Sequence, residues 1–293
     1  GHPEAIRKLA FDQPVARSIG SDINRLKDQL VSIFLPRTCI GHVSRPLLTM
    51  FPKTLCPHTP RDQAPFIAKP HAVGYAPLML ASAFSHVTTW VFDLDNTLYP
   101  PEARLFDQIE VKMTKWVAET LNVTRAEADH LRKHYWQKYG TTLAGLMEEH
   151  GADPRPYLIE VHEISLDHLE VDQHLADMIR ALPGRRIVYT NGSEPYARRV
   201  LNVRGLEPLF DAVYGVEHAG FRPKPERQAF ESVFKKDELS PNSAAMFEDE
   251  PRNLAAPFEL GMRTVHVAPD VVDAPHIHHH TDDLVGFLSQ ILR

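Results

Sequence analysis

Residues 88–101 read TTWVFDLDNTLYPP, and this stretch restricts the possible fold more than any other part of the chain. The apolar residues 90–92 lead directly into Asp93 and Asp95, which one leucine separates. Short apolar runs of this kind are typical of buried strands in parallel sheets, and open α/β sheets bind ligands at the carboxyl ends of such strands. Alternation along an extended chain points Asp93 and Asp95 to the same side. The stretch therefore predicts a buried strand that ends in two carboxylates.

Two carboxylates held this close repel each other, so the pair is unfavourable unless a cation or a proton lies between them. Oxygen ligands of this type suit Mg²⁺, which commonly binds one or two carboxylates together with a substrate phosphate. Asp and Asn residues are also common in ordinary turns after strands, so this stretch alone leaves a plain turn open.

Strand and helix patterns alternate from residue 172 to the carboxyl end. Strands are expected at 186–189, 212–216, 244–247 and 264–267, and helices at 175–182, 194–203, 225–234, 253–260 and 284–292. This alternation predicts a parallel sheet with right-handed crossovers, which is a Rossmann-like α/β core. Polar residues gather just after strands of this set: Thr190 and Asn191, then Lys224, then Glu248 and Asp249.

Residues 105–172 have a helical pattern and interrupt the alternation. Thr124 and Glu127 form a capping-box pattern at the start of one of these helices. We therefore expect a small helical cap at 105–172, inserted into a core made of residues 86–104 and 173–293. A turn that contains Thr141 and Thr142 could reach a substrate, although an ordinary turn between helices fits equally well.

Residues 1–85 are rich in proline and show little periodicity, which predicts a poorly ordered extension with one helix at 21–34. Cys39, His42, Cys56 and His58 do not have the spacing of a standard zinc finger. We therefore expect no zinc site in this extension.

The overall charge excludes some classes of protein. The net charge is −6, from 38 acidic and 32 basic residues, which argues against a protein that binds a nucleic-acid polymer through a basic face. No window approaches the roughly 20 apolar residues that cross a bilayer. The two cysteines favour a reducing cytoplasm over a disulfide framework. The oligomeric state cannot be predicted from these features.

Four motifs now stand in order: DLDNT at 93–97, TNG at 190–192, RPKP at 222–225 and FEDEPRNL at 247–254. In this order they resemble the motifs of the haloacid dehalogenase (HAD) superfamily, and in particular those of its pyrimidine 5′-nucleotidase-like phosphatases. The resemblance covers about residues 84–293 and leaves out the proline-rich extension.

The chemistry of the residues agrees with this resemblance. Asp93 can act as a nucleophile that forms an aspartyl-phosphate, and Asp95 can protonate the leaving group and then deprotonate water. The resemblance assigns Mg²⁺ to the Asp93 carboxylate, the Asp95 carbonyl and the Asp249 carboxylate. It implies that Thr190, Asn191 and Lys224 bind the phosphoryl group, and Glu248 is expected to orient Lys224 or the metal's waters.

Asp95 distinguishes two branches of the superfamily. A halide leaves without a proton, so a dehalogenase does not need an acid at this position, whereas a phosphatase does. We therefore predict a Mg²⁺-dependent phosphomonoesterase that acts on a small-molecule phosphate ester. The resemblance implies pyrimidine nucleoside 5′-monophosphates. A sugar-phosphate phosphatase or phosphomutase is the alternative, and a non-catalytic interaction protein with the same fold is the alternative of another class.

Histidines occur at two further places of interest. His162 could touch the substrate, but we expect it to be a buried structural histidine. His276 and residues 278–280 resemble a metal-binding tract. Since Mg²⁺ prefers oxygen ligands, we interpret the tract as a solvated loop with incidental affinity for transition metals.

Overall fold

The computed structural model describes residues 77–293, and its centre is one parallel sheet of six strands in the order β3-β2-β1-β4-β5-β6. The strands are β1 (Thr89–Phe92), β2 (Arg185–Tyr189), β3 (Ala212–Tyr214), β4 (Ala244–Glu248), β5 (Arg263–Val267) and β6 (His279–Thr281). The predicted Rossmann-like α/β fold is confirmed. The sequence prediction lacked β6, which is short and rich in histidine.

Strand β1 lies inside the sheet because it pairs on both sides. Val91 is in register with Ile187 of β2 and with Met246 of β4. All four residues of β1 are buried, which explains why its sequence is an unbroken apolar run with no alternation. The strand order reverses at this point: β2 and β3 lie on one side of β1, and β4 to β6 lie on the other.

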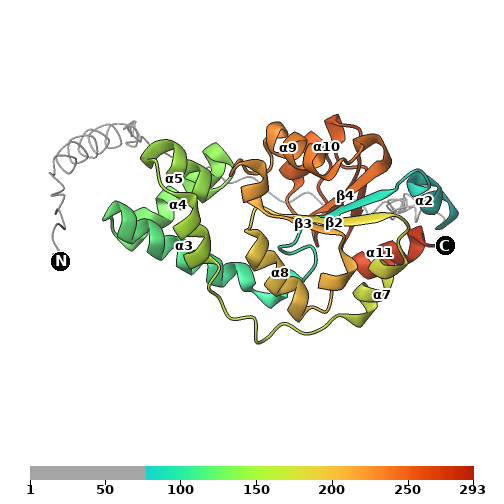
Figure 1. Ribbon diagram of the computed structural model, residues 1–293, viewed down its shortest axis with the longest axis horizontal. Helices are drawn as coiled ribbons and strands as arrows, with labels where there is room; N and C mark the ends of the chain where they lie inside the picture. The colour runs from blue at the N-terminus through green and yellow to red at the C-terminus, as the bar shows by residue number, and fades with distance from the viewer. Residues whose placement is uncertain (1–76) are drawn as a thin grey trace, which may run out of the picture. The chain divides into compact units, whose positions relative to one another are not determined.

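Helices cover both faces of the sheet (Figure 1). Helices α9 (Arg227–Asp237) and α10 (Ala255–Glu259) lie on one face, and α7 (Gln173–Ala181), α8 (Glu194–Val203) and α11 (Leu284–Ile291) lie on the other. The buried side chains form two apolar clusters that match these faces. Val91 and Met246 belong to the α9 side, whereas Phe92 and Phe247 belong to the α8 side.

A helical bundle stands between β1 and β2 in the sequence and beside the sheet in space (Figure 1). It consists of α3 (Leu105–Leu121), α4 (Arg125–Tyr139), α5 (Thr142–His150) and α6 (Pro154–Val161). The capping box predicted from Thr124 and Glu127 is present at the start of α4. Helix α6 begins at a proline, Pro154, and has a second proline at Pro156. Asp153 accepts a hydrogen bond from the Arg155 N–H, and Pro154 occupies the first helical position.

The predicted core begins at residue 86, and a helix stands directly before this boundary. Residues 77–84 form helix α2 (Pro77–Phe84). Phe84 is buried and packs against Trp90 and Phe287. Helix α2, with the apolar sequence PLMLASAF, packs against α11. The predicted helix at 21–34 and the candidate zinc ligands Cys39, His42, Cys56 and His58 lie outside the described residues.

The histidine tract is not a solvated loop, which corrects a prediction. Residues 279–281 form β6, whose backbone pairs with β5. His278 Nδ1 lies 2.8 Å from Thr264 Oγ1, and His276 Nε2 lies 3.0 Å from the Pro251 carbonyl oxygen. The His279 ring packs against Phe84. These histidines therefore complete the edge of the sheet. Among residues 77–293, no helix has the length and apolar character that crossing a membrane requires.

Candidate functional site

The four predicted motifs meet at the carboxyl ends of the strands, where the strand order reverses. Asp93 follows β1 directly, and its backbone N–H donates to the Phe247 carbonyl oxygen, 2.9 Å away. Glu248 is the last residue of β4. Open α/β sheets form their ligand crevice at such a reversal, because the loops after the two adjacent strands separate there.

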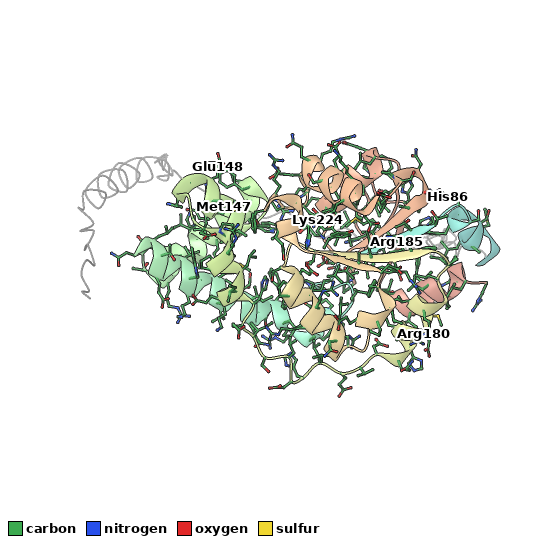
Figure 2. All side chains as sticks on the ribbon, in the orientation of Figure 1. His86, Met147, Glu148, Arg180, Arg185 and Lys224 are labelled. Carbon is green, nitrogen blue, oxygen red and sulfur yellow. The ribbon has the colours of Figure 1, made fainter. Side chains whose placement is uncertain are left out.

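Lys224 lies where the sheet approaches the helical bundle (Figure 2), and it connects the ends of β1 and β4. Its Nζ lies 2.6 Å from Asp93 Oδ1 and 2.6 Å from Glu248 Oε2, and it also donates to the Tyr189 carbonyl oxygen, 3.1 Å away. Burial alone lowers the pKa of Lys224, but Asp93 and Glu248 outweigh this effect and hold the pKa above its usual value. Lys224 is therefore a buried ammonium ion, and all three of its N–H bonds have acceptors.

Asn191 holds the backbone of Lys224 in place. The Lys224 N–H donates to Asn191 Oδ1 at 2.8 Å, and Asn191 Nδ2 donates to the Lys224 carbonyl oxygen at 3.1 Å. Asn191 of the TNG motif and Lys224 of the RPKP motif, which are 33 positions apart, thus join the two motifs by a two-point contact. The Asn191 side chain fixes the lysine, while its backbone lies beside Thr190 at the cavity.

Three carboxylates lie close together here: Asp93, Glu248 and Asp249 each offer one oxygen, and these oxygens lie within 4.8 Å of one another. Burial raises the pKa of Asp93, and the charge of Glu248 raises it further. Burial, Glu248 and Asp93 raise the pKa of Asp249 to about 9. These raised pKa values show that the three carboxylates repel one another, and when all three are ionised the single Lys224 ammonium balances only one of their charges. The donor set is all oxygen, so both its chemistry and its charge suit a divalent cation such as Mg²⁺.

Asn96 fixes the third carboxylate. Its Nδ2 donates to Asp249 Oδ2 at 3.1 Å, and its backbone has a φ of 58°. This left-handed conformation is accessible to Asn more readily than to most residues, because the short amide side chain tolerates it. Asn253 supports the site from the other side, since its Nδ2 donates to Glu248 Oε1 at 3.2 Å.

The Asp95 side chain lies outside this carboxylate cluster. Its Oδ1 accepts hydrogen bonds from the phenols of Tyr99 and Tyr196, and its Oδ2 is 3.5 Å from Thr190 Oγ1. Burial raises the pKa of Asp95, and the two phenols partly oppose that rise. Asp93 and Asp95 therefore occupy different environments, one beside an ammonium and the other beside two hydroxyl donors. The role predicted for the Asp95 carbonyl concerns the backbone and stays a prediction.

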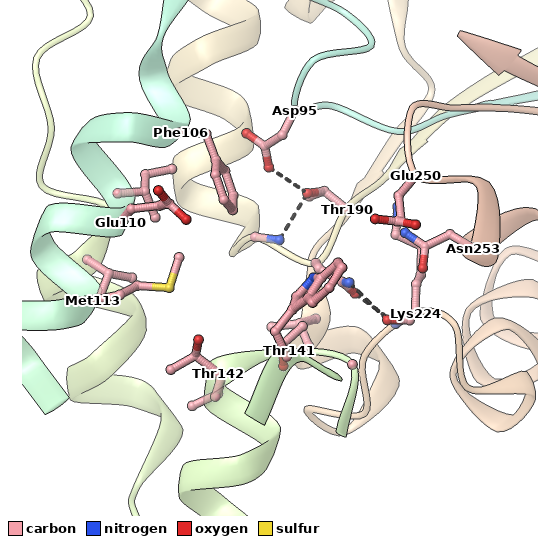
Figure 3. A pocket seen from close by; sticks show the side chains of 18 of the residues that line it. Asp95, Phe106, Glu110, Met113, Thr141, Thr142, Thr190, Lys224, Glu250 and Asn253 are labelled. Atoms are coloured by element: carbon pink, nitrogen blue, oxygen red, sulfur yellow. Dashed lines mark hydrogen bonds between the residues drawn. The ribbon is translucent and has the colours of Figure 1, made fainter. Parts of the chain in front are cut away.

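A cavity of about 480 Å³ lies above these groups (Figure 3). Asp93, Asp95, Thr190, Lys224 and Asp249 line the side that belongs to the sheet. The opposite side comes from the helical bundle, and its lining includes Phe106, Glu110, Met113, Trp136, Thr141 and Thr142. Thr141 and Thr142, predicted as possible substrate contacts, therefore face the predicted catalytic residues across the cavity. Thr141 Oγ1 also accepts the Ala144 N–H and so begins helix α5.

Arg252 joins the core to the helical bundle at the edge of this cavity. Its guanidinium lies 3.8 Å from the centre of the Trp136 ring and donates to the carbonyl oxygens of Trp136 and Gly140, at 3.2 and 3.3 Å. These carbonyls are at the carboxyl end of α4, where the helix dipole favours a cation. Gly140 has a φ of 88°, and a Cβ there would lie 3.3 Å from the Lys224 carbonyl oxygen. The bundle thus approaches the lysine loop closely.

His162 lines the cavity but makes structural contacts. Its ring stacks on Tyr196, with 4.3 Å between ring centres and 7° between planes, and its Nδ1 lies 3.1 Å from Ser193 Oγ. Burial lowers the pKa of His162 to about 4. The residue is neutral near pH 7. Its position between α6 and α8 allows both the structural role favoured from the sequence and contact with a ligand in the cavity.

Several residues of the site were not predicted. Tyr99 and Tyr196, Asn96, Asn253 and Arg252 were overlooked because each has an ordinary structural explanation in its own segment. Asn253 and Arg252 do fall within the FEDEPRNL motif, which was a usable signal. Tyr196 stands on a helix with no local cue. Only the fold brings it to Asp95, 101 positions away.

This chain matches one family in a comparison with models of known protein families. A model described as haloacid dehalogenase-like hydrolase matches residues 87–261. "Phosphate metabolism protein 8" of Saccharomyces cerevisiae is 24% identical over 196 residues, which cover 61% of this chain and 61% of that protein. This chain thus spans about three fifths of the length of its yeast relative.

Solved structures with a similar fold include an HAD phosphatase from Thermococcus onnurineus. It is 17% identical, with a TM-score of 0.49, and the match covers 70% of this chain and 98% of that one. The HAD-hydrolase YfnB of Bacillus subtilis, bound to magnesium, is 18% identical, with a TM-score of 0.47 and the same coverage. A 2-haloacid dehalogenase of Pseudomonas syringae pv. tomato is 19% identical, with a TM-score of 0.45, and again covers 70% of this chain and 98% of its own.

Proposed function

Because the chain belongs to the haloacid dehalogenase-like hydrolases, we propose that it is a Mg²⁺-dependent phosphomonoesterase that forms an aspartyl-phosphate on Asp93. The observation that carries this proposal is the pair of carboxyl groups in different environments. Asp93 lies 2.6 Å from the Lys224 ammonium, whereas Asp95 accepts two phenolic hydrogen bonds and faces the same cavity. The first suits a nucleophile, and the second suits an acid and base.

In the first step, a carboxylate oxygen of Asp93 attacks phosphorus while the bond from phosphorus to the leaving-group oxygen breaks. Asp95 gives its proton to that oxygen, so the product leaves as an alcohol. In the second step, Asp95 removes a proton from water, the water oxygen attacks phosphorus, and phosphate leaves Asp93. The proton taken from water stays on Asp95, so both aspartates are back in their starting states.

The Lys224 ammonium favours the ionised form of Asp93 against the effects of burial and Glu248, and it orients the carboxylate. Its positive charge lies where negative charge develops. The Thr190 hydroxyl and the Asn191 backbone N–H are proposed to donate to the phosphoryl oxygens. Asp93, Asp249 and the Asp95 carbonyl are proposed to hold Mg²⁺, with Glu248 beside them and in contact with Lys224. When bound, Mg²⁺ supplies positive charge that offsets the carboxylates and the phosphate.

We propose that helices α3–α6 act as the cap of the enzyme and that pyrimidine nucleoside 5′-monophosphates are its substrates. The cavity volume of about 480 Å³ falls in the usual range for sites that bind small molecules. Its bundle side combines apolar residues such as Phe106 and Met113 with the carboxylate of Glu110. This combination suits a leaving group with a flat apolar face and hydroxyl donors, as in a nucleoside. The name of the yeast relative also refers to phosphate metabolism.

The test is phosphate release from a panel of nucleoside monophosphates and sugar phosphates, with Mg²⁺ or with EDTA. We expect turnover that needs Mg²⁺, is fastest with a pyrimidine nucleotide, and is lost in Asp93→Asn. The exchange of one oxygen for nitrogen keeps the shape of the side chain, so folding can be checked and matched. Faster turnover of a sugar phosphate would correct the substrate. No release from any ester by the folded protein would overturn the proposed function.

A further inference from the structure

The two oxygens of the Asp95 carboxylate have different surroundings. Oδ1 accepts from the Tyr99 hydroxyl at 2.6 Å and from the Tyr196 hydroxyl at 2.8 Å. Among residues 77–293, the one hydrogen-bond partner of Oδ2 is Thr190 Oγ1, at a long 3.5 Å, and that hydroxyl oxygen already accepts the Gly192 N–H at 2.9 Å. A carboxylate oxygen has two in-plane lone pairs, so two phenolic donors saturate Oδ1. Any proton that Asp95 carries must therefore lie on Oδ2.

Both phenols are held rigidly. Tyr99 and Tyr196 are each 1% exposed, Tyr99 in the turn after β1 and Tyr196 on α8. Burial raises the pKa of both hydroxyls, and the nearby charge of Asp95 raises each pKa further. They therefore keep their protons and act as donors. The parallel ring of His162 prevents the Tyr196 ring from tilting.

We propose that Tyr99 and Tyr196 are positioning residues that confine the catalytic proton of Asp95 to Oδ2 and direct it at the leaving-group oxygen. This inference rests on the proposed function, because it concerns the acid of that reaction. The Oδ2–H bond breaks and an O–H bond forms on the leaving-group oxygen, as the bond from that oxygen to phosphorus breaks. Without the phenols, either oxygen can carry the proton and the carboxyl group can rotate.

A structural role is the alternative, in which the phenols only satisfy a buried carboxylate. The two roles differ in their dependence on the leaving group. p-Nitrophenolate leaves without a proton, whereas the alkoxide of uridine 5′-monophosphate needs one. The constant kcat/KM reports only the steps up to and including the first irreversible one. It is therefore insensitive to the later attack by water, in which Asp95 acts as a base.

The experiment measures kcat/KM for p-nitrophenyl phosphate and for uridine 5′-monophosphate in Tyr99→Phe, Tyr196→Phe and the double variant. General acid catalysis contributes roughly 10²- to 10⁴-fold to the rate. A variant in which the Asp95 proton is less well directed should therefore lose roughly tenfold or more in kcat/KM for uridine 5′-monophosphate. We expect p-nitrophenyl phosphate to lose less than about threefold, because its leaving group needs no acid. In Asp95→Asn, the loss of kcat/KM should again be greater for uridine 5′-monophosphate than for p-nitrophenyl phosphate, and the difference between the two losses should be larger than in the tyrosine variants.

Tyr214→Phe is the matched control. The Tyr214 hydroxyl donates to the buried Asp237 carboxylate at 2.8 Å, so this variant also loses a bond from a phenol to a carboxylate. Tyr214 does not line the cavity. We expect a comparable loss of stability and the same ratio of the two kcat/KM values as in the wild type.

A measurement that does not need activity examines the contacts themselves. Buried phenolic protons exchange slowly, so proton NMR should show two hydroxyl resonances that disappear singly in Tyr99→Phe and Tyr196→Phe. Both should shift in Asp95→Asn, because an amide oxygen is a weaker acceptor than a carboxylate.

Each outcome decides one point. Hydroxyl resonances that do not respond to Asp95→Asn would overturn the contacts and the inference. An active wild type with equal losses on the two esters would overturn the positioning role alone and leave the proposed function intact. No turnover of either ester by the folded wild type would overturn both.

Discussion

An oxygen of Glu248 lies 2.6 Å from the ammonium of Lys224, and each side chain is only 1% exposed. Two charged groups so far from water are favourable only as a pair, because each alone would lack its hydration. Asp93 completes the arrangement on the other side of the lysine. The same ammonium therefore maintains the fold and orients the proposed nucleophile.

Lys224→Met should lower the free energy of unfolding by about 3–5 kcal/mol, because it leaves two buried carboxylates without their cation. Urea unfolding in EDTA measures this change. Lys235→Met is the control, since Lys235 lies exposed on α9. We expect the control to match the wild type and Lys224→Met to lose activity as well. An unchanged unfolding midpoint in Lys224→Met would contradict the buried pairing.

Adding Mg²⁺ should stabilise the folded protein, because the ion binds the clustered carboxylates only when the fold holds them together. At a concentration 100 times Kd, the gain is about 2.7 kcal/mol, visible as a rise in melting temperature. Asp249→Asn removes one of the three carboxylates and should abolish most of the gain. Glu231→Gln, an exposed change on α9, should retain it. An equal Mg²⁺ response in both variants would place the ion elsewhere.

Arg252→Lys should weaken the contact between the core and the helical bundle. Lysine cannot donate to two carbonyl oxygens and also lie flat on the Trp136 ring. The lost contacts should reduce kcat/KM for uridine 5′-monophosphate by roughly tenfold. Acrylamide quenching should show Trp136 more accessible. Arg227→Lys, which alters only exposed ion pairs with Glu231 and Glu259, should change neither quantity.

His162 should make stability depend on pH in an acidic window. Burial lowers its pKa from 6.5 to about 4 in the folded state, so between these values the unfolded chain binds the extra proton. Stability is therefore full above pH 6.5 and falls as the pH drops to 4, by about 3 kcal/mol at most. The groups that face the ring are Ser193 and Tyr196, and the Arg199 guanidinium binds the His162 carbonyl oxygen nearby.

Urea unfolding from pH 7.5 to 4.5 measures this dependence. His162→Gln should remove the contribution of His162 and flatten the curve over the window. His174→Gln, a change at an exposed histidine of α7, should leave the wild-type slope. A slope that persists in His162→Gln would assign the acid sensitivity to other groups.

The sequence predicted the sheet well because its strands are short apolar runs followed by polar residues. Asp93, Lys224 and Asp249 were predicted from motifs, and all three line one cavity. Asp93 and Asp249 directly follow strands, whereas Lys224 lies in the loop before α9. The sequence could not predict the partners of Asp95. Tyr99 resembles a core aromatic, and Tyr196 resembles one apolar position on an amphipathic helix. Their shared acceptor is a property of the packing between β1 and α8, which no local pattern encodes.

Helix α2 and strand β6 were missed for the same reason, because packing and not local sequence determines them. Helix α2 and strand β6 are stabilised by packing on one edge of the sheet, where Phe84 meets His279 and Phe287. Residues 279–281 have neither alternation nor an apolar run, so their extended backbone depends on hydrogen bonds to β5. Tertiary contacts thus override weak local propensity at this edge.

The position of β1 also determines the order in which the protein can assemble during synthesis. Thr89 is made early, but its two ladder partners, Arg185 and Ala244, emerge from the ribosome much later. The helical bundle has mostly local contacts and can form in the meantime. The strand that carries the proposed nucleophile therefore waits with both edges open. A nascent chain that stalls before β4 exposes an apolar strand edge, and that stage is where we expect chaperones to be needed.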